Sequence, residues 1–212
     1  MYKTVPIKSI KPVDEYFSIV WQVDLRCNFD CMYCPENFHN LTSPTKTLEQ
    51  LQLSWTKIFD KSAHKNLKYK ISFTGGEVTI NKDFLPFIIW LRENYHDHIF
   101  QIGVSTNGSA AEKYYLKLIE YIDFITFSTH SEFFNEKKFF ENVVACYTKM
   151  QDSAKTIHVN IMNESWHNDR IMTYIDFLKE KDISYTLAEI DFTKQIRQTN
   201  ILNVSKQFYD FG

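Results

Sequence analysis

The sequence predicts an α/β fold, namely a partial (β/α)6 TIM-like barrel whose strands are parallel. Two observations lead to this prediction. Short runs rich in β-branched and aromatic residues alternate with segments whose apolar residues recur at helical spacing, and this alternation is typical of right-handed βαβ units. There are six such units, the last one incomplete, whereas a closed eight-fold barrel takes about 250 residues. An open, partial barrel therefore suits the length of the chain.

Six strands are expected, each a short apolar or alternating run bounded by polar or turn-forming residues. The first is the run FSIVWQVD, and the second, YKISFT, ends at a pair of glycines. The next four runs are IFQIGVS, FITFS, TIHVNIM and ISYTLAEI. The expected strands therefore span 17–24, 69–74, 99–105, 124–128, 156–162 and 183–190.

Apolar stripes at helical spacing predict five helices between these strands. Thr47 with Gln50, and Ser109 with Glu112, have the spacing of a capping box, in which two side chains satisfy the first backbone N–H groups of a helix. Asn81 is the expected cap of the helix that follows the second strand. The expected helices span 47–59, 82–95, 109–119, 136–150 and 168–181.

Composition and charge indicate an ordinary soluble protein. The chain has 212 residues, of which 44% are apolar and 24% charged, and its formal net charge is -2. A nucleic-acid partner is not expected, because such partners usually require a basic surface. No apolar run is long enough for a membrane span, and the first residues lack the apolar stretch of a signal peptide, so we expect a cytoplasmic protein and no membrane partner. We expect an N-terminal extension at 1–16, a core domain at 17–191 and a C-terminal tail at 192–212.

Three of the four cysteines lie within eight residues, directly after the first expected strand. Cys27, Cys31 and Cys34 have the spacing C-x3-C-x2-C, and three thiolates on one loop can ligate three irons of a cubane cluster. The fourth iron would then be open, as catalysis requires and structural sites avoid. The alternative is a zinc site completed by His39 or another ligand, although zinc sites usually contain paired C-x2-C motifs and only one such pair occurs here.

Two further motifs follow the second and third strands. Gly75 and Gly76, which precede Glu77, allow the backbone to approach a ligand closely, although a plain strand-to-helix turn would read the same way. Ser105 and Asn107 offer a hydroxyl and an amide suited to ribose hydroxyls, although Asn-Gly is also a common turn pair. Since ligands of parallel α/β folds bind at the carboxyl ends of the strands, all three motifs are expected to form one site.

The three motifs, in this order, resemble those of the radical S-adenosylmethionine (SAM) superfamily, and the match includes Tyr33 just before the last cysteine. The resemblance implies that the cysteines hold a [4Fe–4S] cluster whose open iron binds SAM. An electron from the cluster then cleaves SAM to methionine and a 5′-deoxyadenosyl radical, which abstracts hydrogen from a substrate. It also implies an external electron donor such as flavodoxin or ferredoxin. Residues Gly75, Gly76 and Glu77 match the family's contact to the SAM amino group, and Ser105 and Asn107 match its ribose contact.

Further site residues follow from their positions at strand ends. Ser128 is a candidate for the SAM ribose or carboxylate, while Asn160 and Met162 could flank adenine or simply pack in their strand. His130 and Glu189 are candidate catalytic residues on the substrate side. For each of these residues, ordinary packing or a surface loop is the alternative.

Two other side chains could contribute to the site, and a third is assigned to the core. Asp191 could face the same mouth as Glu189, and His39 could shield the cluster, touch substrate or lie in a solvated loop. Cys146 lies on or beside the apolar face of its helix, so it is interpreted as a core residue rather than a hydrogen donor.

The substrate is the least determined part of the function. A small metabolite such as a nucleoside, a sugar or a pterin-like molecule is the first hypothesis, because no peptide-binding segment precedes the first strand and no cysteine-rich extension follows Cys146. Modification of a peptide or protein is the second hypothesis, since six units would leave an open mouth. A zinc-binding interaction module is the non-enzyme alternative.

Overall fold

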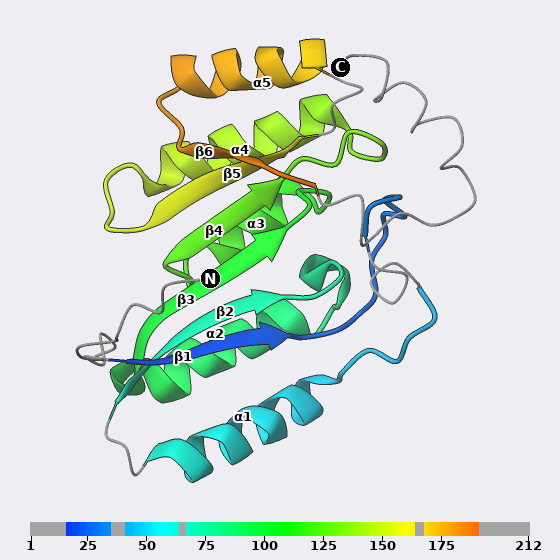
Figure 1. Cartoon of the computed structure of the whole chain (residues 1–212). Coiled ribbons are helices and arrows are strands. Elements are labelled where there is room, and N and C mark those ends of the chain that lie inside the picture. Colours follow the sequence, from blue (N-terminus) through cyan, green and yellow to red (C-terminus); the bar gives the residue numbers. More distant parts are fainter. Residues whose placement is uncertain (1–15, 35–40, 64–66, 164–167, 191–212) are drawn as a thin grey trace, which may run out of the picture.

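The computed structural model of the chain describes residues 16–34, 41–63, 67–163 and 168–190. Within them, six parallel strands form one sheet in the order β1-β2-β3-β4-β5-β6 (Figure 1). Each strand thus lies beside its neighbour in the sequence, as expected for successive right-handed crossovers. The prediction of a partial parallel barrel is confirmed. The strands are β1 Tyr16–Gln22, β2 Lys68–Thr74, β3 Ile99–Thr106, β4 Phe124–Ser128, β5 Thr156–Met162 and β6 Tyr185–Ala188.

Helices connect the strands and cover one face of the curved sheet (Figure 1). The capping box of Thr47 and Gln50 is present at the start of the first helix. Two short 3-10 turns, η3 Val78–Ile80 and η4 His96–His98, flank the second helix. The α-helices are α1 Leu48–Ser62, α2 Phe84–Tyr95, α3 Glu112–Leu118, α4 Glu136–Met150 and α5 Asn168–Glu180.

Two of the predicted helix caps are wrong. Helix α3 has Ala111 at its N-cap and no side-chain cap, because the Ser109 hydroxyl instead accepts a hydrogen bond from Asn28. Helix α2 has Asp83 at its N-cap. The Asn81 side chain, two residues before it, accepts a hydrogen bond from the Asp83 backbone N–H in the turn that precedes the helix. At α3, a contact with the distant Asn28 engages the side chain that the local spacing predicts as a cap. At α2, a turn at residues 82–83 separates the predicted cap from the start of the helix.

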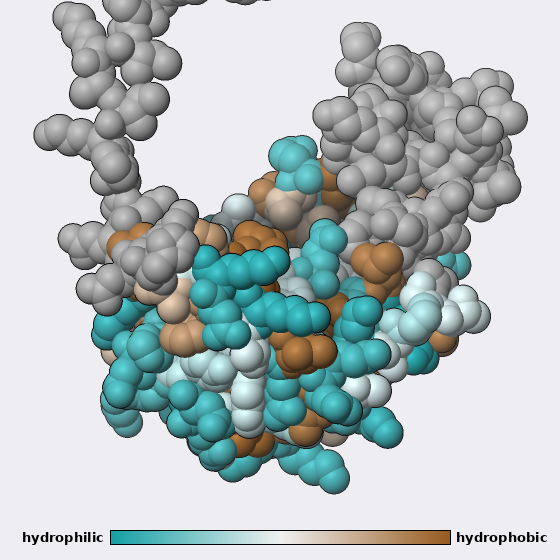
Figure 2. All heavy atoms as spheres, turned by 90° about the horizontal axis from the view of Figure 1, so that it is seen from below, coloured by the Kyte–Doolittle hydropathy of each residue, from teal (hydrophilic) through white to brown (hydrophobic). Residues whose placement is uncertain are grey.

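The apolar core lies between the sheet and the helices. Alternate residues of β2, namely Tyr69, Ile71 and Phe73, are buried on this side. The ring of Phe73 packs edge-to-face on Phe84 and Phe87 of α2. Seen from below, the side on which α1 lies in Figure 1, the surface is mostly hydrophilic with scattered apolar residues (Figure 2), as is normal for a solvated helix face. No helix among the described residues is long and apolar enough to cross a membrane.

The opposite, concave face of the sheet carries a row of polar side chains. Gln22 pairs with Thr74, and the pairing of Phe73 with Val104 leaves Thr74 beside Ser105. The row then continues through paired residues of β4 and β5 and ends beside β6. A barrel interior is usually filled by branched apolar residues, so this face differs from an ordinary packed barrel. The polar row consists of Gln22, Thr74, Ser105, Thr126, His158 and Ser184.

Candidate active site

One cavity, of about 280 Å³, lies at the carboxyl ends of the strands and gathers most of the predicted site residues. Such a position is where ligands bind in parallel α/β folds. Of the predicted residues, Tyr33, Glu77, Asn160, Met162 and Glu189 are absent from its lining. The predicted residues that line it are Cys27, Cys31, Cys34, Gly75, Gly76, Ser105, Asn107, Ser128 and His130.

The three cysteines reach this cavity from the segment that follows β1. None of the three forms a disulfide, and Cys31 is only 2% exposed. The sulfur of Cys27 accepts a hydrogen bond from the backbone N–H of Phe29 at 3.4 Å and one from Asn107 Nδ2 at 3.9 Å. Burial raises the pKa of Cys27 to about 11. Its hydrogen bond with Cys34, followed by burial, raises the pKa of Cys31.

These thiols suit an iron–sulfur cluster. A coordinating metal deprotonates a thiol outright, and the two N–H groups beside Cys27 are then placed to stabilise the thiolate. Among the described residues, no three His, Cys, Asp or Glu side chains are arranged around a single metal ion. A cubane cluster does not need that arrangement, because each cysteine binds a different iron. The cysteine loop, residues 27–34, therefore has the donor set that a cluster requires.

The glycine pair lies against the chain that leads into the cysteine loop. A β-carbon on Gly76 would lie 2.1 Å from the backbone oxygen of Arg26, and one on Gly75 would lie 2.2 Å from that of Asp24. Gly75 also has a φ of +144°, which residues other than glycine rarely adopt. The Gly76 N–H donates to the Asp24 oxygen at 3.0 Å. The glycines thus permit a close approach of two chain segments as well as lining the cavity.

Glu77 lies beneath the cavity, with an exposed fraction of 1%. Its carboxylate accepts hydrogen bonds from the Thr79 N–H, the Thr106 hydroxyl and the Asn107 N–H, at 3.0, 2.8 and 2.5 Å. Burial raises the pKa of Glu77, and these hydrogen bonds oppose that shift. The geometry makes Glu77 the link between the ends of β2 and β3.

The loop after β3 grips one end of the cysteine loop. Asn107 Nδ2 donates to Asn28 Oδ1 at 3.0 Å, and Asn28 Nδ2 donates to the Ser109 hydroxyl at 3.0 Å. From helix α4, the buried Asn142 donates to the backbone oxygens of Gly108 and Ala110, at 3.0 and 3.1 Å. The loop after β3 is therefore held from both sides, and it is itself a support for the cysteines.

The loop after β4 grips the other end. His130 Nδ1 lies 2.7 Å from the Tyr33 hydroxyl and 3.5 Å from the Cys31 sulfur. The Met32 N–H donates to the Glu132 carboxylate at 3.2 Å, and the ring of Phe133 stacks on that of Phe29. His130 was predicted on the substrate side, and the structure places its Nδ1 against the cysteine loop.

The remaining predicted residues are placed as follows. Ser128 pairs with Asn160 on the neighbouring strand, and the Met162 N–H donates to the hydroxyl of Thr129 at 3.0 Å. Glu189 is exposed, and its carboxylate accepts from Asn163 at 3.4 Å. Cys146 is fully buried in the core, as its helical position predicted. His39 and Asp191 lie outside the described residues.

Sequence reasoning missed several residues of this site. Gln22 and Thr74 line the cavity and begin the polar row, and strand alternation could have found them. Phe29 also lines the cavity, but no local pattern distinguishes it from a core residue. Asn142 left no local signal at all, because its partners are 34 and 32 residues away.

Comparison with known proteins identifies the family. The model of the radical SAM superfamily matches residues 23–188, which is most of the chain. The chain belongs to the radical SAM superfamily. The zinc-module alternative is thereby set aside. Members of this superfamily are enzymes that use a [4Fe–4S] cluster and SAM, so those cofactor predictions are confirmed at the level of the family.

Curated relatives of this radical SAM chain include nucleotide enzymes. The chain is 32% identical over 113 residues to GTP 3',8-cyclase of Pasteurella multocida, which covers 50% of the chain and 32% of that protein. It is 31% identical over 96 residues to S-adenosylmethionine-dependent nucleotide dehydratase of Selenomonas ruminantium, which covers 44% of the chain and 30% of that protein. The matched segments thus span about a third of these relatives.

Solved structures support the radical SAM fold. BtrN, solved in complex with AdoMet and 2-DOIA, superposes with a TM-score of 0.51 at 20% identity, over 73% of this chain and 58% of BtrN. The anSMEcpe structure with bound AdoMet gives a TM-score of 0.60 at 16% identity, over 82% of this chain and 49% of that one. At these identities the likeness concerns the fold alone.

Proposed function

We propose that this chain binds SAM beside a [4Fe–4S] cluster, cleaves it reductively, and thereby starts hydrogen abstraction from a small, uncharged, hydroxylated metabolite. The observation that carries the proposal is one cavity whose lining includes the three cysteines, the glycine pair and the polar ends of β3 and β4. No one of these motifs would suffice, because three cysteines can also belong to a zinc site, and the glycine pair and the Asn-Gly pair also occur in ordinary turns.

Each group in the cavity has a proposed task. Cys27, Cys31 and Cys34 would hold the cluster, and the backbone of Gly75 and Gly76 would face the SAM amino group. When bound, the cluster passes one electron from an external donor such as flavodoxin or ferredoxin to SAM, giving methionine and the 5′-deoxyadenosyl radical that takes a substrate hydrogen atom. Ser105 and Asn107 are proposed for the SAM ribose, and Ser128 for the ribose or the carboxylate. Asn160 and Met162, which lie on β5 outside the cavity lining, are proposed for the adenine.

The polar row supports an uncharged, hydroxyl-rich substrate. Gln22, Thr74 and Ser105 line the cavity, and the row continues from them across the concave face. His158 holds the far end, with its two ring nitrogens 2.9 Å from the hydroxyls of Ser184 and Thr186. Burial lowers the pKa of His158, which favours the neutral ring, and the other five side chains of the row are hydroxyls and an amide. Neutral hydroxyls and amides recognise sugar or nucleoside hydroxyls by hydrogen bonds.

The named relatives point in the same direction. GTP 3',8-cyclase and the nucleotide dehydratase both act on nucleotides by their names. The row is suited to the sugar or base of such a molecule rather than to its phosphates, which require cationic partners. A nucleoside-like substrate is therefore our first choice, ahead of a free sugar or a pterin-like molecule.

SAM cleavage tests the first half of the proposal. Anaerobically reconstituted protein should be brown and, with a reductant, should release 5′-deoxyadenosine. The Cys31→Ala variant should release none, while Cys146→Ala, which removes a thiol remote from the cavity, should keep the release if it folds. Full release by Cys31→Ala, or colourless protein holding zinc, would overturn the proposal.

Substrate stimulation tests the second half. Neutral nucleosides and sugars, added one class at a time, should raise 5′-deoxyadenosine release above the basal rate and yield a modified product. Unmodified peptides should not do so. Stimulation by peptides alone would support the protein-modifying alternative instead.

A further inference from the structure

The loop that follows β4, residues 129–134, is anchored at both of its ends. The Thr129 N–H donates to the Asn160 backbone oxygen at 2.9 Å, and the Thr129 hydroxyl accepts from the Met162 N–H. Phe134 is buried and packs edge-to-face on Phe139 and Tyr174 of the helices behind the sheet. The residues between these anchors therefore have a defined position over the cavity.

These intervening residues meet the cysteine loop at three points. The His130 ring stacks on the ring of Tyr33, with its Nδ1 2.7 Å from the Tyr33 hydroxyl and 3.5 Å from the Cys31 sulfur. Glu132 accepts the backbone N–H of Met32. Phe133 stacks on Phe29, with ring centroids 5.9 Å apart.

We propose that His130 is a positioning residue of the iron–sulfur centre, which fixes Cys31 through its Nδ1 while Glu132 fixes the adjacent backbone. The inference rests on the proposed function, and it replaces the substrate-side role first expected of His130. A thiolate sulfur can only accept hydrogen bonds. In the state that binds the cluster, His130 Nδ1 therefore carries a proton. It donates this proton to the Cys31 sulfur, or to the Tyr33 oxygen while the Tyr33 hydroxyl donates to that sulfur.

This contact has two consequences for the centre. Groups that orient metal ligands from behind typically change metal affinity about 10–100-fold when they are removed. Hydrogen bonds to the sulfurs of a cluster also help to set its reduction potential. Since reduction adds negative charge to the cluster, a lost donor should shift the potential to a more negative value.

Thiol labelling of the cluster-free protein tests the positioning directly. In the wild type, Cys31 is 2% exposed and should react slowly with iodoacetamide. In His130→Ala, mass spectrometry should show the Cys31 adduct forming several-fold faster, because the ring that lies 3.5 Å from the Cys31 sulfur is removed. Cys146 is fully buried in the core, so its continued protection shows that the variant is folded. Equal labelling of Cys31 in both proteins, with Cys146 protected, would overturn the proposal.

The loaded protein gives a second, independent measurement. His130→Ala should lose iron to a chelator about 10-fold faster than the wild type, and its cluster should have a more negative potential. His130→Asn, whose amide can take the place of Nδ1, should restore both properties at least in part. His96→Ala is the matched control, because His96 is an exposed histidine that contacts Asp97, far from the cysteines in the fold.

The outcomes separate this inference from the proposed function. If His130→Ala keeps normal iron retention and potential, still cleaves SAM, and fails only to convert substrate, then His130 is a substrate-side residue and the positioning role is wrong. If His130→Ala does not fold, Glu132→Gln should show the faster Cys31 labelling, and its absence there would overturn the proposal. If the wild type itself binds no cluster, the proposed function fails and this inference fails with it.

Discussion

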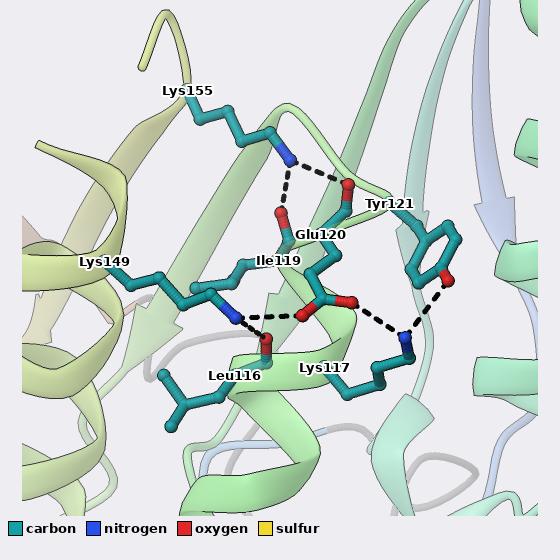
Figure 3. Close-up of polar contacts among 7 residues, drawn as sticks. All are labelled: Leu116, Lys117, Ile119, Glu120, Tyr121, Lys149 and Lys155. Atoms are coloured by element: carbon teal, nitrogen blue, oxygen red, sulfur yellow. Dashed lines mark hydrogen bonds and ion pairs between the residues drawn. The ribbon is translucent and has the colours of Figure 1, made fainter. Parts of the chain in front are cut away.

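Different interactions stabilise the two ends of the sheet: lysine side chains at the amino end, and buried hydrogen bonds at the carboxyl end. At the amino end, where α3 returns toward β4, lysines reach across the surface to the last turn of that helix (Figure 3). Lys149 donates to the Leu116 oxygen and to the Glu120 carboxylate, each at 2.9 Å. Lys155 donates to the backbone oxygens of Ile119 and Glu120. These are cations at a helix C-terminus, which is a favourable but modest interaction in water.

At the carboxyl end, the sheet is held together by buried hydrogen bonds and by close backbone contacts. Glu77 takes three hydrogen bonds without exposure to solvent, and Gly76 has no space for a β-carbon beside Arg26. A buried polar group that loses its partner pays a full desolvation cost, whereas an exposed lysine is resolvated by water. The end that carries the cavity should therefore tolerate change poorly, and the other end should tolerate it well. Four predictions test this contrast.

The largest effect is expected for Gly76→Ala. The new β-carbon would lie 2.1 Å from the Arg26 backbone oxygen and 2.8 Å from that of Leu25, so the segment entering the cysteine loop has to move. We expect a loss of about 1–3 kcal/mol in the free energy of unfolding, measured by urea denaturation, together with weaker SAM binding. The control is Lys137→Ala on α4, whose side chain is 86% exposed. A variant as stable as the wild type would contradict the tight packing at this end.

Glu77→Gln should have the next largest effect. The carboxylate faces donors on both oxygens, Thr79 and Thr106 on one and Asn107 on the other. In either orientation, the amide NH₂ of glutamine would face a donor and leave it without an acceptor. We expect a loss of about 1–2 kcal/mol and faster hydrogen exchange at the Asn107 amide. Glu93→Gln, on the exposed face of α2, should change neither quantity.

Lys155→Met should cost less. The variant keeps the aliphatic stem and removes the ammonium group from the Ile119 and Glu120 carbonyls, which water can then reach. We expect a loss of about 0.5–1 kcal/mol, with iron content and SAM cleavage unchanged. If Lys155→Met instead lowered iron content as much as a change near the cavity, the two ends would be coupled and the contrast would be wrong.

The smallest effect concerns the pH dependence of Glu120. Lys117 and then Lys149 hold the pKa of Glu120 at about 2, below its ordinary value of 4.5. Because the folded pKa is the lower one, the contribution of Glu120 to stability is fully present above pH 4.5 and is lost as the pH falls toward 2. NMR titration of the side-chain carboxyl carbon should show the shift, and added salt should reduce it because the pair is exposed. An ordinary pKa at low salt would show that the lysines do not hold this carboxylate.

Much of the fold was predictable from local pattern. The ranges of β4, β5 and α4 agree with the expected runs 124–128, 156–162 and 136–150. The boundaries of β1 and β6 agree less well, because β1 begins and ends earlier and β6 is only 4 residues long. The two wrong caps, Asn81 and Ser109, both form hydrogen bonds that spacing does not reveal. Asn81 accepts from Asp83 in the turn before α2, and Ser109 accepts from the distant Asn28.

The sequence by itself determined the family and the location of the site. Three cysteines at fixed spacing, a glycine pair and a polar strand end, each placed after a successive strand, are enough, because parallel strands bring their carboxyl ends together. These features are local and periodic, so they can be read without knowing the contacts.

Only the tertiary structure decided what supports the cysteines. The contacts of Asn107 to Asn28, and of His130 to Cys31, join residues 79 and 99 positions apart. The glycine pair likewise allows the chain to pack closely against the backbone of Asp24 and Arg26, in addition to lining the cavity. Such contacts depend on how the strand-end loops fold over the sheet, and that is set by packing across the whole barrel rather than by any local run of residues.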